Sequence, residues 1–422
     1  MEFSKFNIIH ETNGEVFIYN TISEVLISIN NNSFALLKKN VVAYLNSISE
    51  EEQNIIITSK IIANDKIEVA NIIKIREAEY SNNNLYTVIY PTLNCNFKCN
   101  YCFQSEYPCE SMNSNTVESI MKYFEHQFML NKNSQLFITW MGGEPLLSLD
   151  IIESISSKLN KKYKTSYFSK IITNGFLLTN TTLSILESLN VYAIQITIDG
   201  LSDVHDKRRI TKEGGGTFDV ILNNIDSLLK IHNKIHLIIR VNLDKQNIDK
   251  FSEIYNYFHT KYNGYNYSIY PCFVDNFSFI CKSGIDSPSS LPRETRSRFF
   301  LDLMFKNNIK IIDYLPRYSH TSCLSKIKNS IAVGPDGGVY KCTTLVGDKR
   351  FCIGNIKDNN IYKTINAKPF NIEPKCLECN LFPVCDGGCP ILNINSNGSQ
   401  NCHISKGFEK EFVSAYLLNL NS

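Results

Sequence analysis

Residues 91–104, PTLNCNFKCNYCFQ, contain three cysteines in a C-x3-C-x2-C spacing. They are Cys95, Cys99 and Cys102. Three thiolates can hold a cubane 4Fe–4S cluster and leave its fourth iron open, whereas a cluster that only carries electrons normally has four protein ligands. Because the stretch follows the extended run 85–90 (LYTVIY), it is expected on a loop at a strand end, where α/β folds place active sites. The spacing therefore predicts a cluster with a chemical role, and zinc is the alternative, although zinc sites favour two separated cysteine pairs.

A glycine pair follows about forty residues later in the run WMGGEPL, residues 140–146. Gly142 and Gly143 would let the backbone approach a ligand closely. The carboxylate of Glu144, which precedes Pro145, could accept a hydrogen bond from an ammonium group. The alternative is an ordinary turn.

Three more polar groups follow apolar strands downstream. Thr173 and Asn174 come after one such strand, and Asp199 is the next-to-last residue of the run IQITIDG, residues 194–200. The adjacent Arg208 and Arg209 close the segment HDKRR.

In this order, the motifs resemble those of radical S-adenosylmethionine (SAM) enzymes. The resemblance implies that Cys95, Cys99 and Cys102 bind the SAM cluster and that the GGEP turn holds the SAM amino group. It implies Thr173 and Asn174 near the ribose, with Arg209 on the SAM carboxylate and Arg208 as the fallback. Arg240 and Asn242 would face the barrel interior near SAM, or alternatively lie at the rim. The SAM contacts expected in this way are Tyr101, Phe103, Gly142, Gly143, Glu144, Pro145, Thr173, Asn174, Asp199, Arg209, Arg240 and Asn242.

A second group of cysteines lies near the C-terminus, spaced C-x13-G-x4-C, then C-x2-C-x5-C-x3-C, then a final cysteine. Zinc ribbons use similar pairs and are the alternative. The pattern resembles the SPASM extension of radical SAM enzymes, which carries two auxiliary iron–sulfur clusters. The resemblance assigns one cluster to Cys376, Cys379, Cys385 and Cys402, and the other to Cys323, Cys342 and Cys389.

The second auxiliary set is one ligand short. Its fourth position could be filled by Cys352, Cys281 or Cys272, although all three could be ordinary buried thiols. Alternatively, the fourth iron stays open, and a substrate cysteine thiolate could bind there.

Composition limits the class of protein. A chain of 422 residues predicts two or three domains. The 43 basic and 41 acidic residues give a net charge of +2, which provides no footprint for nucleic acid. Because the chain starts without an apolar signal segment and has no run of membrane-spanning length, we expect a cytoplasmic protein without membrane partners. Its 14 cysteines are then available to metals rather than disulfides.

Strands and amphipathic helices alternate between residues 85 and 275, which predicts βαβ units with a parallel sheet. The expected strands are 85–90, 135–140, 168–172, 191–198, 235–242 and 267–273. The expected helices are 113–130, 149–162, 178–189, 217–232 and 249–260. Six such units form a partial (β/α)6 TIM-type barrel, the core fold of the family, expected over residues 81–305. Residues 306–422 would form the cluster-binding SPASM domain.

Residues 1–80 contain no cysteine. Strands are expected at 15–21 and 25–29, turns at 13–14 and 30–32, and helices at 34–45 and 50–62. The segment resembles the winged-helix leader-recognition domain of ribosomal-peptide maturases, which captures an extended peptide by strand addition. The alternative is an accessory domain that covers the barrel.

These resemblances imply a radical SAM peptide maturase that cleaves SAM to a 5′-deoxyadenosyl radical. Its expected partners are a ribosomally made precursor peptide and an electron donor such as flavodoxin or ferredoxin. The expected product is a crosslink, most often a Cys thioether. Carbon–carbon crosslinking or epimerisation is one alternative, and a non-catalytic iron–sulfur scaffold is another. A third, the anaerobic sulfatase-maturating enzyme, normally has Asp where Thr343 follows Cys342, and lacks the long N-terminal extension.

Overall fold

The computed structural model of the chain divides into two compact units that interleave in sequence. Unit 1 contains residues 1–80, 292–322 and 370–422, and unit 2 contains residues 81–291 and 323–369. The three-domain division expected from the sequence stays a prediction. The structure describes residues 1–12, 14–102, 104, 107–108, 110–274, 291–307, 309, 315–318, 323–358, 361, 372–385, 387–393 and 402–420.

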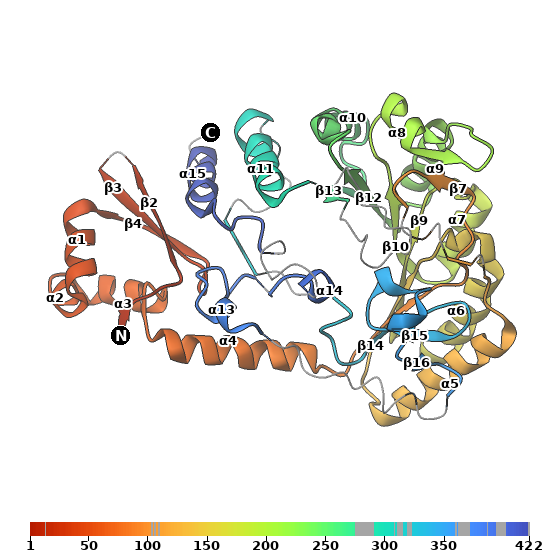
Figure 1. Cartoon of the computed structure of the whole chain (residues 1–422), viewed down its shortest axis with the longest axis horizontal. Coiled ribbons are helices and arrows are strands. Elements are labelled where there is room, and N and C mark those ends of the chain that lie inside the picture. The colour runs from red at the N-terminus through yellow and green to blue at the C-terminus, as the bar shows by residue number, and fades with distance from the viewer. Residues whose placement is uncertain are drawn as a thin grey trace. The chain divides into compact units, whose positions relative to one another are not determined.

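Unit 2 is built on six parallel strands in sequential order, with helices over their outer face (Figure 1). The strands are β6 (Leu85–Ile89), β8 (Leu136–Trp140), β9 (Tyr167–Thr173), β10 (Val191–Thr197), β12 (His236–Leu243) and β13 (Tyr267–Phe273). The helices are α5 (Ser114–Leu130), α6 (Leu149–Tyr163), α7 (Asn180–Ser188), α9 (Phe218–Ile231) and α10 (Phe251–Lys261). This confirms the predicted partial (β/α)6 barrel.

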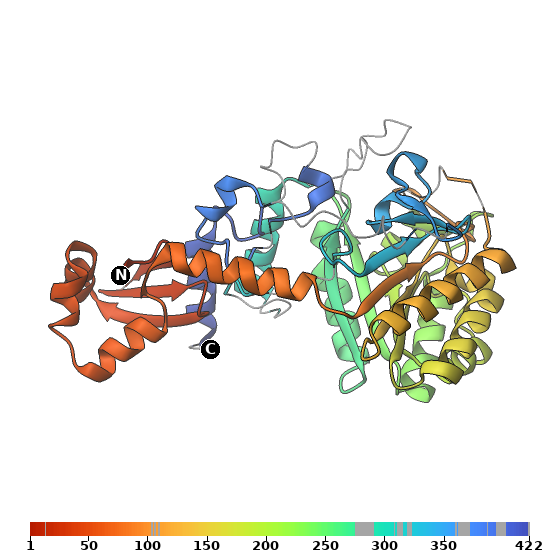
Figure 2. The same cartoon turned by 90° about the horizontal axis from the view of Figure 1, so that it is seen from below.

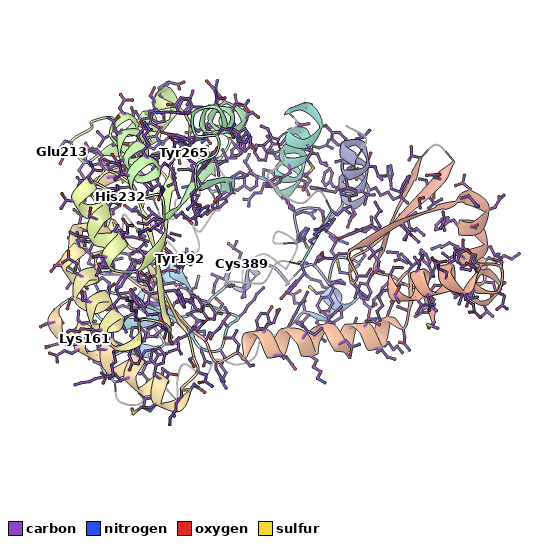
Figure 3. The ribbon with its side chains drawn as sticks, turned by 180° about the vertical axis from the view of Figure 1, so that it is seen from behind. Lys161, Tyr192, Glu213, His232, Tyr265 and Cys389 are labelled. Atoms are coloured by element: carbon purple, nitrogen blue, oxygen red, sulfur yellow. The ribbon has the colours of Figure 1, made fainter. Side chains whose placement is uncertain are left out.

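Side-chain alternation on β9 shows how the strands face two environments. Tyr167, Ser169 and Ile171 are buried, and the Tyr167 hydroxyl hydrogen-bonds Ser156 of α6 at 2.9 Å, so this face packs on the helices. The residues between them are only partly buried. Because successive side chains of a strand point to opposite faces, this second face lines the barrel interior. In the helical layer, His232 (Figure 3) follows α9 and its Nδ1 lies 2.9 Å from Glu187.

Three strands extend the sheet beyond β6. Strand β14 (Ser330–Val333) pairs parallel with β6, and β15 (Gly338–Tyr340) and β16 (Gly354–Asn355) follow in antiparallel pairing. The sheet therefore has nine strands with β13 at one end, and it remains open. This extension was not expected from the sequence. It brings the segment that contains Cys342 beside the strand that leads to Cys95.

Unit 1 contains a three-stranded antiparallel sheet in the order β2-β3-β4 (Figure 2). Its strands are β1 (Glu2–Phe3), β2 (Asn7–Thr12), β3 (Glu15–Asn20), β4 (Val25–Asn30) and β5 (Ile62–Ala63). Its first helices are α1 (Asn31–Lys39), α2 (Val41–Leu45), α3 (Glu50–Thr58) and α4 (Asp65–Tyr80). The later helices are α11 (Arg293–Asn307), α13 (Pro374–Leu377), α14 (Pro390–Asn393) and α15 (Glu409–Leu420).

The N-terminal segment differs from the expectation because two asparagines act as helix N-caps. Asn30 accepts from Ser33 N at 2.8 Å, so a helix begins where a turn was expected. Asn40 accepts from Ala43 N at 3.0 Å and has φ of −154°, which splits the expected single helix into α1 and α2. The sequence also missed β2 and α4.

The two faces of the N-terminal sheet enter two different cores. On one face, Val16 and Ile18 pack with residues of α1, α2 and α3. On the other face, Ile8 and Tyr19 join a core that includes the cysteine-rich segment of the same unit. The partners in that second core are Leu315, Leu381, Val384 and Val413, with Cys379 and Cys385 packed against it. The sheet and the cysteine segment are therefore parts of one packed structure.

None of the helices in the described part of the chain is both long and apolar enough to cross a membrane.

Arg76 of α4 tests this joint packing. It is 3 % exposed and donates from Nη2 to the carbonyls of Phe382 and Pro383 at 2.6 and 2.9 Å. Replacing it by Met should lower the free energy of unfolding by about 3 kcal/mol, because two charge-assisted hydrogen bonds are lost. Urea unfolding measures this, and the exposed Lys74→Met on the same helix should change stability by less than about 0.5 kcal/mol. If Arg76→Met were as stable as Lys74→Met, the packing of α4 against the cysteine segment would be contradicted.

Candidate active site

The glycine pair packs directly on the loop that leads into the first three cysteines. A Cβ on Gly142 would meet the Thr92 carbonyl oxygen at 2.3 Å, and one on Gly143 would meet the Asn94 carbonyl oxygen at 2.2 Å. Gly143 N also donates to Thr92 O at 3.2 Å. The glycines therefore let two backbones come together, whereas the sequence suggested an approach to a ligand.

Glu144 is fully buried and accepts three hydrogen bonds through its carboxylate. Oε1 accepts from Leu146 N at 3.1 Å and from Thr173 Oγ1 at 2.7 Å, and Oε2 accepts from Asn174 N at 2.7 Å. Its own backbone N–H donates to Asn94 O at 2.7 Å. Burial raises the pKa of Glu144, and these donors oppose that rise. Glu144 thus ties three loops together, which the sequence did not indicate.

The three cysteines of the first motif are all partly buried, and Cys99 ends the short strand β7 (Phe97–Cys99). Burial raises the pKa of Cys95 to about 12, and the charges of Cys99 and Cys102 contribute to the rise. Burial also raises the pKa of Cys99, and Arg209 opposes it. Each thiolate disfavours ionisation of its neighbours, so three thiolates here would need a nearby positive charge. The iron ions of a cluster can supply that charge. Across the described residues no three His, Cys, Asp or Glu side chains already form a metal centre, so ligation stays a prediction.

Tyr101 lies between two of the cysteines and connects several predicted SAM contacts. Its hydroxyl donates to Asp199 Oδ1 at 3.1 Å and accepts from Arg209 Nη1 at 2.7 Å and Asn242 Nδ2 at 3.1 Å. Arg240 Nε in turn donates to Asn242 Oδ1 at 2.8 Å. Burial raises the pKa of Tyr101, which keeps the hydroxyl protonated as a donor. The structure therefore gathers these five residues into one network.

The adjacent arginines have different surroundings. Arg208 forms buried ion pairs with Asp199 at 2.9 Å and Asp244 at 3.0 Å. Arg209 has its guanidinium 5.9 Å from the Phe97 ring centroid, and its buried Nε has no hydrogen-bond partner among the described residues. Arg208 Nη2 is also buried without a hydrogen-bond partner among the described residues, so this feature does not separate the two arginines. Because two buried aspartates already neutralise Arg208, the geometry favours Arg209 for the carboxylate of an amino-acid-like ligand.

Local pairing that the sequence missed positions these groups. Strand β11 (Arg209–Thr211) pairs antiparallel with β7 (Phe97–Cys99), which sets Arg209 opposite Cys99. Asn247 donates from Nδ2 to the carbonyls of Asp199 and Asn242 at 2.8 and 2.9 Å, and so joins the ends of β10 and β12. In the sequence, the only indication of these two contacts was that a polar residue follows each strand.

Four of the C-terminal cysteines surround one cavity in unit 1. Its volume is about 320 Å³, and its sulfur lining comes from Cys376, Cys379, Cys385 and Cys402. Burial raises the pKa of Cys385, while backbone N–H groups of Gly387 and His403 donate to its sulfur. Burial lowers the pKa of His403 to about 4. Four sulfur atoms on one cavity fit a fully ligated cluster.

The other predicted set is divided between the two units. Cys323 and Cys342 belong to unit 2, and Cys389 (Figure 3) belongs to unit 1. Their grouping stays a prediction. Among the spare cysteines, Cys352 donates from Sγ to Gly354 O at 3.0 Å, so its thiol already has a hydrogen-bond partner two residues away.

Three further predicted residues remain to be placed. Cys272 is on β13, in register with Asn242 of β12. Phe103 and Cys281 lie outside the described residues.

Comparison with known families agrees with this geometry. Residues 89–258 match the model of the radical SAM superfamily. The chain is a radical SAM enzyme. The matched residues include the three cysteines, the GGEP turn and both arginines. A radical SAM domain binds SAM together with a 4Fe–4S cluster, and the residue assignments above remain predictions.

Known relatives of this radical SAM enzyme include maturases. The cysteine-type anaerobic sulfatase-maturating enzyme of Clostridium novyi is 26 % identical over 76 % of this chain and 93 % of its own length. The structure titled "Native anSMEcpe with bound AdoMet" has a TM-score of 0.63 and 21 % identity, covering 80 % of this chain and 98 % of the other. Streptococcus suis SuiB bound to precursor peptide SuiA has a TM-score of 0.54 and 15 % identity, covering 95 % and 98 %. These structural likenesses show the shared fold.

Gly143→Ala tests the contact between the glycine pair and the cysteine loop. The new methyl group would overlap the Asn94 carbonyl, so the loop should shift and the chain should lose the iron of one cubane, about four atoms. Iron analysis after anaerobic reconstitution measures this. Gly215→Ala is the matched control, because its Cβ would meet only Thr211 Oγ1 at 3.4 Å. Full iron content in Gly143→Ala would contradict the model of the site.

Substitution of the two arginines should separate structure from ligand binding. Arg208→Ala leaves Asp199 and Asp244 without their buried cation and should reduce stability by about 3 to 5 kcal/mol. Arg209→Ala should weaken SAM binding by about 1.5 to 3 kcal/mol, or roughly tenfold to a hundredfold. Thermal unfolding and equilibrium SAM binding distinguish these effects. If Arg208→Ala weakened SAM binding and Arg209→Ala reduced stability instead, the carboxylate contact would belong to Arg208.

Proposed function

We propose that this protein is a maturase that crosslinks side chains in a ribosomally made precursor peptide, with a Cys thioether as the favoured product. The observation that carries the proposal is the N-terminal three-stranded sheet joined to a radical SAM barrel. The likeness to SuiB extends over 95 % of this chain, and the likeness to anSMEcpe over 80 %. SuiB is a protein whose structure was determined with a precursor peptide.

The edge strand β4 supports peptide binding by strand addition. In the order β2-β3-β4, strand β4 pairs only with β3 and leaves its outer edge without a strand partner in the described sheet. Strand β2, at the other edge, contacts α15. An open edge offers backbone donors and acceptors to an extended peptide. The leader of a precursor would thus bind at β4.

The roles of the barrel residues follow from the site geometry. When bound, SAM and its cluster would supply the 5′-deoxyadenosyl radical that abstracts hydrogen from a substrate carbon. Arg209 would hold the carboxylate of SAM, and the turn at Thr173 and Asn174, fixed by Glu144, would lie beside the nucleoside. Arg240 and Asn242 would keep Tyr101 oriented. The barrel interior would exclude water from the reacting atoms.

Two auxiliary clusters complete the proposed cofactor set. Their ligands would be the four cysteines of the unit 1 cavity, and Cys323, Cys342 and Cys389. Total iron should then be about twelve atoms per chain, three cubanes' worth.

Sulfatase maturation is the second candidate. It is favoured by the relatives, because Clostridium enzymes of that name match over 85 % or more of their own length. Thr343 after Cys342 and the N-terminal sheet favour the first candidate instead.

The deciding experiment supplies the reconstituted enzyme with SAM, dithionite and one of two substrates. One is a candidate precursor peptide from a short open reading frame next to the gene, and the other is a sulfatase polypeptide. Mass spectrometry should show loss of hydrogen with retention of sulfur in the precursor only, and alanine at Cys95, Cys99 and Cys102 should abolish it. Modification of the sulfatase alone would establish the second candidate.

Hydrogen–deuterium exchange tests the leader site without a truncation. Backbone amides of β4 should exchange more slowly when the precursor is added, because the peptide would hydrogen-bond its open edge. Amides of β2 serve as the internal control and should not change. Equal exchange of β4 with and without peptide would place precursor recognition elsewhere.

A further inference from the structure

A short turn, residues 402–408, contributes three different groups to the four-cysteine cavity of unit 1. They are the residues Cys402, His403 and Lys406, which all line the cavity. Gly407 has φ of +83°, a conformation that glycine adopts without strain. The turn therefore combines one predicted ligand with two groups that can donate hydrogen bonds.

Helix α11 holds this turn in place. Ser297 Oγ donates to Ile404 O at 2.5 Å, and Arg293 Nη1 donates to Lys406 O at 2.7 Å. Ser405, between those two carbonyls, is fully buried. Because α11 binds the turn on both sides of Ser405, His403 and Lys406 have fixed positions at the cavity wall.

Hydrogen bonds within the turn determine which nitrogen of His403 carries a proton. The backbone N–H of Ser405 donates to Nδ1 at 3.2 Å. An amide N–H can only donate, so Nδ1 is the acceptor and the proton of the neutral ring is on Nε2. His403 also donates its backbone N–H to the sulfur of Cys385. The residue thus provides its backbone N–H to a cysteine sulfur, and its ring carries a second donor at Nε2.

Lys406 places a positive charge on the same side. Its Nζ donates to Asn380 Oδ1 at 3.2 Å and lies 3.5 Å from Glu409 Oε1. Its charge also interacts with the sulfur of Cys379. Lys375, which lines the same cavity, is exposed and pairs with Glu373 at 2.9 Å, so solvent screens its charge more strongly.

We propose that His403 and Lys406 raise the reduction potential of the cluster bound by Cys376, Cys379, Cys385 and Cys402. The inference rests on the proposed function, because it requires that cluster. Reduction adds negative charge to a cluster, and a cation or N–H donors beside its sulfur atoms stabilise the reduced form. A raised potential suits a cluster that receives electrons, so the turn would define the direction of electron flow in unit 1.

An EPR-monitored redox titration of the reconstituted full-length enzyme tests this inference. Variants with alanine at Cys95, Cys99 and Cys102, and at Cys342, assign the signals of the other clusters. Lys406→Gln and His403→Phe should each shift the midpoint potential of the unit 1 cluster to more negative values. Lys406→Glu should shift it further than Lys406→Gln, and Lys406→Arg should keep the wild-type potential. Lys375→Gln is the matched control, with a smaller shift.

The outcomes separate this inference from the proposed function. If the wild-type chain binds iron for the SAM cluster alone, the auxiliary clusters and the inference both fail. If the cluster assembles but Lys406→Gln and His403→Phe keep the wild-type potential, the inference fails and the proposed function stands. If only one of Lys406→Gln and His403→Phe loses its cluster, the midpoint potential of the other variant tests the inference. Loss of the cluster in both, with Lys406→Arg intact, would also overturn the inference, since the turn would then serve only assembly.

Discussion

The buried carboxylate of Glu144 is the contact on which the predicted SAM site depends. A carboxylate removed from water is costly unless donors replace its hydration. Here the backbone of residues 146 and 174 and the hydroxyl of Thr173 supply them. Because Glu144 N also bonds Asn94 O, one residue holds the loops after β6, β8 and β9 in register. A ligand ammonium at this carboxylate would join an existing network.

Tyr101 has a comparable role for the second half of the barrel. Its hydroxyl bonds to Asp199 in the loop after β10, to Arg209 of β11 and to Asn242 of β12, beside the first cysteine motif. Helix α8 (Ser202–Arg208) lies between β10 and β11 in the chain. Consecutive arginines can serve different purposes there because Arg208 ends the helix and Arg209 begins a strand. One side chain then points to buried aspartates, and the other stays beside the cysteine loop.

Unit 1 joins the proposed peptide-binding edge to the four-cysteine cavity through shared hydrophobic packing. Tyr19 of β3 and the segment around Cys379 and Cys385 lie in the same core, and Arg76 binds the carbonyls between those cysteines. The proposed peptide binding at the sheet and the proposed chemistry at the cavity would therefore be properties of one folded unit. That coupling is a physical reason for a maturase to keep its N-terminal sheet.

Much of this protein could be predicted from its sequence, because the decisive signals are local. The strand expected at 191–198 is Val191–Thr197, since buried parallel strands alternate with amphipathic helices along the chain. The cysteine spacings likewise indicate metal chemistry without knowledge of the fold. The tertiary structure alone decided what Gly142 and Gly143 approach, which arginine is paired, and that β14 extends the sheet beside β6. Those contacts join residues far apart in sequence, where a hydrogen bond or a close approach leaves no local pattern.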